Sequence, residues 1–213
     1  FPRGMPFLIG DGEVQLFVGG RCDFQEEKQK KHSLQLLQEQ SRAVSQKEEE
    51  MREYHTQMEA ARKGICTPQM EAVARKEQMS TGELMELMAQ GKVIIPCNRL
   101  HECIEPNGIG SMLKTKINVN LGTSRDWKDM DMELQKVRDA VEMGAESIMD
   151  LSSYGDTAKF RRRLTQECSA IIGTVPIYDA VVYYHKALKD ITAEEWLKIV
   201  EMHAKDGVDF MTI

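Results

Sequence analysis

The sequence predicts an α/β protein in which an N-terminal helical region precedes about the first half of a TIM-like (β/α)₈ barrel. Up to about Gly91 the chain has the composition and capping residues of helices. Beyond that point, apolar strand-like runs alternate with amphipathic helices, and successive runs begin about 25 to 40 residues apart, the length of a βαβ unit. An open parallel sheet is the alternative architecture.

The first predicted region, residues 1–53, is a largely helical extension that resembles nothing we can place. Residues 24–62 contain no glycine or proline and are rich in Gln, Glu and Lys, a composition that favours helix. Residues 1–24 hold several glycines and short apolar runs, from which we expect a small hairpin.

The second predicted region, residues 54–91, is a set of short helices marked by their ends. Gly64 ends the first helix, and Thr67 with Pro68 begins the next with a side-chain cap and a proline in the first turn. Ser80 and Glu83 form a capping box that opens a third helix.

The third predicted region, residues 92–213, contains the repeating strand–helix units and is the truncated half-barrel. A short strand is expected at 93–96. Four longer strands, apolar on both faces as buried parallel strands are, are expected to be adjacent, parallel and in sequential order. They cover residues 116–121, 147–151, 171–176 and 208–213.

Two of the intervening helices are clearly marked. The first shows an apolar face and is closed by Gly144, and the second opens with the capping box of Thr192 and Glu195 and is closed by Gly207. Their apolar faces consist of Met130, Leu134, Val137 and Val141 in the first helix, and of Trp196, Ile199, Val200 and His203 in the second.

Composition excludes several classes of function. The chain has 28 basic and 34 acidic residues, a net charge of −6, whereas a dedicated nucleic-acid binder has a basic face. No run approaches the about 18 apolar residues that a membrane span needs. The five cysteines are scattered, odd in number and without the spacing of a zinc or iron–sulfur loop, which favours a reducing cytoplasm.

In a barrel of this kind the active site lies at the C-terminal ends of the strands. These positions supply polar, hydrogen-bonding groups and one thioether, which predicts a barrel enzyme acting on a small polar substrate. Each of these residues also has a purely structural interpretation. Met149 can be a core residue, Tyr178 can cap a strand end, and Asn118 and Asn120 can link neighbouring strands. His101, which lies in a loop, can be an ordinary surface histidine. The strand-end set is Asn118, Asn120, Met149, Asp150, Ser152, Ser153, Tyr178 and Asp179.

Several motifs, in family order and spacing over about residues 55–213, resemble the phosphomethylpyrimidine synthase (ThiC) family. They are TQMEAARKG (56–64), TPQME (67–71), IIPCN (94–98) with His101, KTKINVNLGTS (114–124), MDLS (149–152), IGTVPIYDAV (172–181) and DGVDFMTI (206–213). NVNLG and PIYDA are similar to the shorter, anaerobe-type members. The chain departs from the family between Asn98 and His101 and in the loop at 152–155, so the contacts of that loop are not carried over from the family.

The resemblance implies a radical enzyme that converts 5-aminoimidazole ribotide to 4-amino-5-hydroxymethyl-2-methylpyrimidine phosphate in thiamine biosynthesis. It implies a 4Fe-4S cluster, S-adenosylmethionine and a homodimer, and it suggests zinc as a further metal. The ligands of these metals are expected beyond residue 213. The chain as given is therefore expected to be inactive. Carried over by motif, the substrate-binding residues are Asn120, Met149 and Tyr178.

Two alternative functions stay open at this point. A paralogue converts the same ribotide to 5-hydroxybenzimidazole, a cobalamin precursor, and shares the barrel, the cluster and the substrate. A chain with an unplaced extension and no cluster cysteines is also compatible with a non-catalytic fragment that only binds a ligand or a partner.

Overall fold

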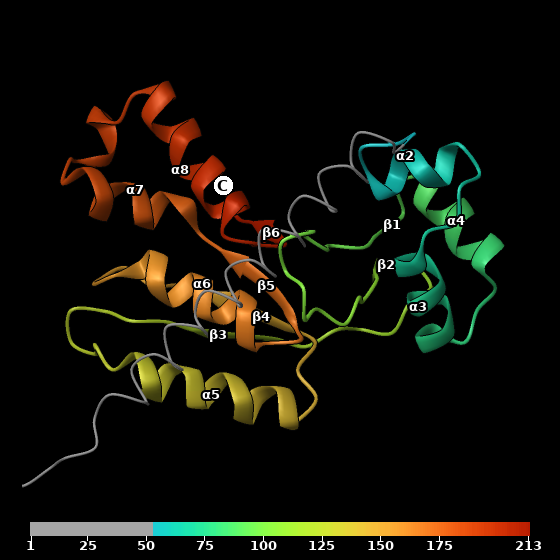
Figure 1. Ribbon diagram of the computed structural model, residues 1–213, viewed down its shortest axis with the longest axis horizontal. Coiled ribbons are helices and arrows are strands. Elements are labelled where there is room, and N and C mark those ends of the chain that lie inside the picture. The colour runs from blue at the N-terminus through green and yellow to red at the C-terminus, as the bar shows by residue number, and fades with distance from the viewer. Residues whose placement is uncertain (1–52) are drawn as a thin grey trace, which may run out of the picture. The chain divides into compact units, whose positions relative to one another are not determined.

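The structure is a computed structural model that describes residues 53–213 (Figure 1). The hairpin predicted within residues 1–24, and most of the helix predicted over 24–62, lie outside the described residues. Within the described residues the prediction of one helix up to Arg62 was wrong in part, because residues 53–56 are not helical and a separate short helix, α2 (Gln57–Arg62), begins after its N-cap Thr56. The predicted end is confirmed, since Lys63 caps α2 just before Gly64.

Three short helices form the beginning of the described chain, as the capping pattern predicts. The Thr56 hydroxyl caps α2, and the Thr67 hydroxyl caps α3 (Pro68–Glu77) by accepting from the Met70 amide. Ser80 and Glu83 form the predicted capping box of α4 (Thr81–Ala89). The helices bury an apolar cluster of Ala60, Ala61, Met70, Val73, Ala74, Leu84, Met88, Val93 and Ile95.

The predicted strand at 93–96 is a two-residue strand, β1 (Val93–Ile94). It pairs antiparallel with β2 (Ile109–Gly110), so that Val93 lies opposite Gly110. Gly110 has a φ of +144°, and a Cβ atom there would lie 2.1 Å from the Lys92 carbonyl oxygen. The close approach of these two backbones therefore requires glycine.

The four later strands form one parallel sheet in the order β3-β4-β5-β6, which confirms the predicted order and direction. The strands are shorter than predicted. Their bounds are β3 (Asn118–Leu121), β4 (Ser147–Asp150), β5 (Ile171–Thr174) and β6 (Phe210–Met211). The third strand ends early because Pro176 begins a helix instead of ending a strand.

The connections between these strands are helical. They are α5 (Met130–Glu142), α6 (Thr157–Glu167), then α7 (Pro176–Tyr184), the short 3₁₀ helix η1 (Leu188–Asp190) and α8 (Ala193–Lys205). Both predicted helices, and the capping box of Thr192 and Glu195, are confirmed.

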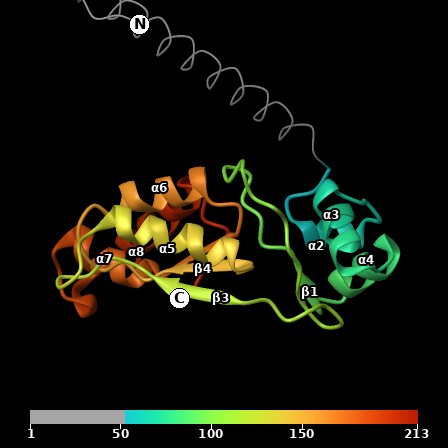
Figure 2. The same cartoon turned by 90° about the horizontal axis from the view of Figure 1, so that it is seen from below.

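One face of the sheet is covered by these helices (Figure 2). Ile148 of β4 and Ile172 of β5 pack in one cluster with apolar residues of α5 and α6. Thr174, on the same side of β5 as Ile172, contacts His203 of α8. The members of the cluster are Leu121, Leu134, Val137, Ala140, Ala145, Ile148, Phe160, Leu164, Cys168, Ala170 and Ile172.

The opposite face of the sheet carries the alternate residues of each strand, and here one prediction was wrong. The strands were expected to be apolar on both faces, but in β3 Asn118 and Asn120 are exposed while Leu121 is buried. Because successive side chains of a strand point to opposite faces, the two asparagines lie on the face away from the helices. We call this side of the sheet the open face.

Candidate functional site

Polar and apolar side chains meet in two rows across the open face. In the first row Asn120 of β3 lies in register with Met149 of β4, which lies in register with Gly173 of β5 and then Phe210 of β6. In the second row Asn118 lies in register with Ser147. The structure thus places the predicted substrate residues Asn120 and Met149 side by side on neighbouring strands.

A chain of hydrogen bonds joins the polar residues of the two rows. The Ser147 hydroxyl donates to Oδ1 of Asn118 over 2.9 Å, and Nδ2 of Asn118 donates to Oδ1 of Asn120 over 2.9 Å. Asn118 therefore links β3 to β4, which is the structural role considered above for both asparagines. Within residues 53–213 the Asn120 side chain hydrogen-bonds only along its own strand, to Asn118.

Gly173 leaves room on the open face, and the Phe210 ring fills it. A Cβ atom on Gly173 would lie 2.2 Å from Cζ of that ring. Phe210 and Met149 also line a pocket of about 490 Å³ together with Asn118, Ser147 and residues between Ile109 and Lys116. Most of this lining lies at or before the N-terminal ends of the strands, so the pocket is not by itself the site expected at their C-terminal ends.

The loops that follow β3 and β4 are bound to each other at the C-terminal edge of the sheet. Gly122 has a φ of +142°, and a Cβ atom there would lie 2.5 Å from the Ser152 amide nitrogen. The Thr123 amide donates to the Ser152 hydroxyl over 3.0 Å, and the Ser153 amide donates to the Thr123 carbonyl over 2.9 Å. The loop at 152–155, where the sequence departs from the family, is thus held by the backbone of its neighbour.

Tyr178, the third predicted substrate residue, lies outside these rows. It occupies the first turn of α7, just beyond the C-terminal end of β5, and the residue is 46% exposed. Sequence reasoning placed it at a strand end, whereas Pro176 has already begun the helix. The structure thus brings together Asn120 and Met149 and puts Tyr178 on a separate element.

Asp179, which the strand-end pattern also selected, is buried on the helix side of the sheet. Its Oδ2 atom lies 3.0 Å from Nη1 of Arg161 and 3.0 Å from Nε2 of His203, and the Thr157 hydroxyl donates to its other oxygen. His203 in turn contacts the Thr174 hydroxyl over 2.8 Å. Burial would raise the pKa of Asp179, but the hydrogen bonds from His203 and Thr157 and the Arg161 charge outweigh it and lower the pKa to about 2. This carboxylate is structural.

The low pKa of Asp179 predicts a pH dependence of stability. The pKa of an aspartate is about 3.9 in the unfolded chain, whereas that of Asp179 is about 2 in the folded protein. The ionised Asp179 therefore contributes its full stabilisation at pH values above the unfolded pKa. That contribution, about 2–3 kcal/mol, is lost as the pH falls from about 4 through 2. Urea unfolding between pH 2 and 6 should show this loss, and Asp179→Asn should remove it. An unchanged slope in Asp179→Asn would contradict the assignment.

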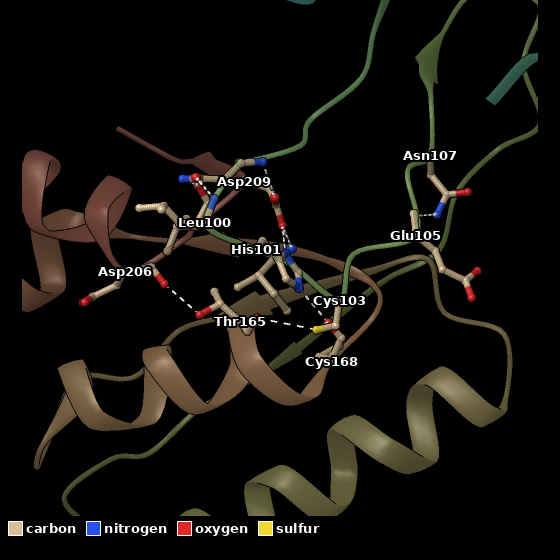
Figure 3. Close-up of polar contacts among 12 residues, drawn as sticks. Leu100, His101, Cys103, Glu105, Asn107, Thr165, Cys168, Asp206 and Asp209 are labelled. Atoms are coloured by element: carbon tan, nitrogen blue, oxygen red, sulfur yellow. Dashed lines mark hydrogen bonds and ion pairs between the residues drawn. The ribbon is translucent and has the colours of Figure 1, made fainter. Parts of the chain in front are cut away.

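His101 is buried, so the interpretation of it as a surface histidine was wrong (Figure 3). Its Nδ1 lies 2.8 Å from Oδ2 of Asp209, and its Nε2 lies 2.7 Å from the Cys168 carbonyl oxygen. The imidazole ring thus lies between two hydrogen-bond acceptors, a carboxylate and a backbone carbonyl. The Asp209 carboxylate also accepts from the amides of Asn98 and Ile172, each over 2.7 Å. This network ties the segment after β1 to β5 and to the start of β6.

The described cysteines do not fit an iron–sulfur site. Burial, with a smaller effect of the Asp209 charge, raises the pKa of Cys97 to about 11, and burial also raises the pKa of Cys168 to about 11. Iron–sulfur clusters are bound by cysteine thiolates, whereas burial favours the neutral thiol at Cys97 and Cys168 in the chain without a metal. Within residues 53–213 no group of three or more His, Cys, Asp or Glu side chains could hold a metal ion. We therefore assign no iron–sulfur ligand among the described cysteines.

The described part of the chain is thus an α/β unit of repeated strand–helix elements whose sheet carries polar side chains on its open face. Between residues 53 and 213 no helix is long and apolar enough to cross a membrane. A sequence model of the Radical SAM ThiC family matches residues 56–213. The chain belongs to this family.

Curated relatives are similar over the same part of the chain. The phosphomethylpyrimidine synthase of Clostridium botulinum strain Hall is 59% identical over 160 residues, which is 75% of this chain and 37% of the relative. The phosphomethylpyrimidine synthase of Clostridium novyi strain NT is 61% identical over 160 residues, with the same coverage of both chains. The chain therefore spans 37% of the length of these relatives.

Sequence reasoning missed several residues that shape this region. Ser147 and Phe210 were given no role, although both lie within predicted strands. Asp209 was named only within the motif at 206–213 and was given no role of its own. Aligning the predicted strands by their first residues places Phe210 in one row with Met149 and Gly173, but it puts Asn118 in that row, whereas the structure puts Asn120 there.

Proposed function

We propose that the complete protein is a phosphomethylpyrimidine synthase. It converts 5-aminoimidazole ribotide to 4-amino-5-hydroxymethyl-2-methylpyrimidine phosphate for thiamine biosynthesis. The observation that carries the proposal is 59% to 61% identity over 160 residues to enzymes of that name, within the Radical SAM ThiC family. Family membership implies S-adenosylmethionine and an iron–sulfur cluster, which together supply the radical. Their ligands lie outside residues 53–213 in this proposal, as do those of any zinc ion.

We further propose that residues 92–213 are the first half of a (β/α)₈ barrel, after an extension at 1–53 and a helical region at 54–91. Two features support the barrel. The four strands are parallel and in sequential order, and the described helices that pack on them do so on one face. A doubly wound sheet instead carries helices on both faces. In a closed barrel the open face becomes the interior.

The proposed substrate contacts are Asn120, Met149 and Tyr178. The Asn120 amide hydrogen-bonds the ribotide, the polarizable thioether of Met149 packs on its ring, and the Tyr178 phenol bonds a hydroxyl or the phosphate. The register of Asn120 with Met149, and the exposure of the Tyr178 side chain, support these roles. A homodimer in the cytoplasm is the proposed state of the complete protein.

Changing Asn120 to alanine in the complete protein should weaken ribotide binding about ten-fold, or by about 1–2 kcal/mol, because one hydrogen bond is lost without added bulk. The melting temperature should stay unchanged, since Asn120 is exposed and its side chain bonds only to Asn118 within residues 53–213. Titration calorimetry and thermal unfolding of one purified variant measure both.

Asn107→Ala is the matched control for this variant. Like Asn120, Asn107 makes one local side-chain hydrogen bond, in this case donated by its Nδ2 atom to the Glu105 carbonyl, but it precedes β2 and lies off the parallel sheet. Ribotide affinity should be normal in this control. An Asn120→Ala protein that is less stable but binds the ribotide normally would assign Asn120 a structural role.

The proposed reaction is tested by its product. The complete protein, supplied anaerobically with the ribotide, S-adenosylmethionine and a reductant, should yield the phosphorylated hydroxymethylpyrimidine, which mass spectrometry identifies. 5-Hydroxybenzimidazole as the product would assign the protein to the paralogous reaction instead. Absence of any product from a protein with its cluster reconstituted would support a role in binding without catalysis.

A further inference from the structure

We propose that Ser147 and Asn118 are positioning residues that fix the side-chain amide of Asn120, so that Asn120 presents its N–H donors to the ligand. The ligand atom that Asn120 contacts is then a hydrogen-bond acceptor. The identity of the ligand as the ribotide rests on the function proposed above, whereas the orientation of the amide does not.

The orientation follows from the order of donors and acceptors along three side chains. Ser147 is buried, and its hydroxyl donates to Oδ1 of Asn118 over 2.9 Å. With its oxygen turned toward β4, Asn118 directs Nδ2 along its own strand to Oδ1 of Asn120, also over 2.9 Å. The oxygen of Asn120 therefore faces Asn118.

The nitrogen of Asn120 is the group left for a ligand. The oxygen and nitrogen of an amide branch apart from one carbon, so an amide whose oxygen faces its strand neighbour turns its NH₂ group away from it. Asn120 is exposed on the open face, beside Met149 in register. The site thus offers a pair of N–H donors next to an apolar thioether wall.

This polarity selects among the groups of the ribotide. The unsubstituted ring nitrogen, the ribose oxygens and the phosphate oxygens accept hydrogen bonds, and each can bond to Asn120 as it is held here. The exocyclic amino group is a donor, so it does not bond to the Nδ2 group that Asn120 turns toward the ligand. Asn120 therefore holds an acceptor atom of the substrate, and Ser147 determines this through Asn118.

The polarity is tested by Asn120→Asp in the complete protein. Aspartate has the shape of asparagine but only acceptor oxygens when ionised. Calorimetry with 5-aminoimidazole ribotide should show binding at least ten-fold weaker than in the unmodified protein, and no tighter than in Asn120→Ala. Binding by Asn120→Asp that equals or exceeds that of the unmodified protein would overturn the assignment of Asn120 as a donor.

The positioning role is tested by a double-mutant cycle on Asn118 and Asn120. Asn118→Ala should weaken ribotide binding several-fold when Asn120 is present and should have no effect in an Asn120→Ala background, because its action passes through Asn120. Ser147→Ala should behave in the same way. Equal losses in both backgrounds would show independent action and overturn the proposal, as would normal binding by a less stable Asn118→Ala protein.

Side-chain amide NMR of the complete protein, labelled with ¹⁵N-asparagine, tests the orientation without any ligand. The Nδ2 protons of Asn118 should exchange with solvent more slowly than those of Asn120, because only the Asn118 nitrogen donates a hydrogen bond within this pair. Slower exchange at Asn120 than at Asn118 would mean that the Asn120 nitrogen is the donor of the pair, and the inference would be wrong. Failure of the ribotide to bind the unmodified protein would instead count against the proposed function.

Discussion

Replacing Asp209 by alanine should lower the free energy of unfolding of the 213-residue chain by about 3–5 kcal/mol, the cost of leaving the partners of a buried charge uncompensated. The Asp209 side chain is fully buried, and it accepts hydrogen bonds from His101 and from the amides of Asn98 and Ile172. Alanine leaves all three donors without an acceptor. Urea unfolding measures the loss.

Two further variants separate the charge from the volume of Asp209. Asp209→Asn keeps the shape but turns one acceptor oxygen into a donor, so it should also be destabilising, though less than alanine. Asp131→Ala removes a carboxylate that pairs with Arg163 over the same 2.8 Å but on an exposed side chain, and it should leave the melting temperature unchanged. If Asp209→Ala unfolded like Asp131→Ala, the buried network would not stabilise the fold.

Replacing Arg161 by methionine should cost about 3–5 kcal/mol at neutral pH. The Arg161 side chain is 1% exposed, and its two terminal nitrogens pair with Asp179 at 3.0 Å and with Asp206 at 2.8 Å. Methionine fills much of the volume but carries no charge. Two carboxylates at the junction of α6, α7 and the end of α8 would then share a largely buried site without their common cation.

The neighbouring Arg162 is a matched control. It pairs with the same carboxylate, Asp206, at 3.4 Å, but its side chain is 52% exposed, and exposed ion pairs contribute little to stability. Arg162→Met should therefore unfold close to the unmodified chain in urea. Similar losses for Arg161→Met and Arg162→Met would mean that burial does not decide the strength of these pairs.

The helices were predictable because their signals are local. Several N-termini are set by a hydroxyl cap and by residues within one turn, as at Thr67, Ser80 and Thr192, and such patterns can be read directly from sequence. The order of the strands followed from the length of the connections. The ends of the strands were less predictable, because only the structure shows that Pro176 starts a helix two residues after β5 ends.

The candidate site was predictable only in part, because it depends on contacts between distant residues. The period of two in a strand places Asn118 and Asn120 on one face, as the structure shows. The partner of Asn118 is Ser147, 29 residues away, and that of His101 is Asp209, 108 residues away. Both pairings depend on strand register and loop packing, which no local pattern specifies.

The central claim is that the ribotide binds on the open face of the sheet, and the location of the bound ligand tests it most directly. A crystal structure of the complete protein with 5-aminoimidazole ribotide should show the ligand against Asn120 and Met149, inside a closed barrel. One of its acceptor atoms should lie within hydrogen-bonding distance of Nδ2 of Asn120. A ligand bound on the helix-covered side, or one held without Asn120 and Met149, would contradict the account.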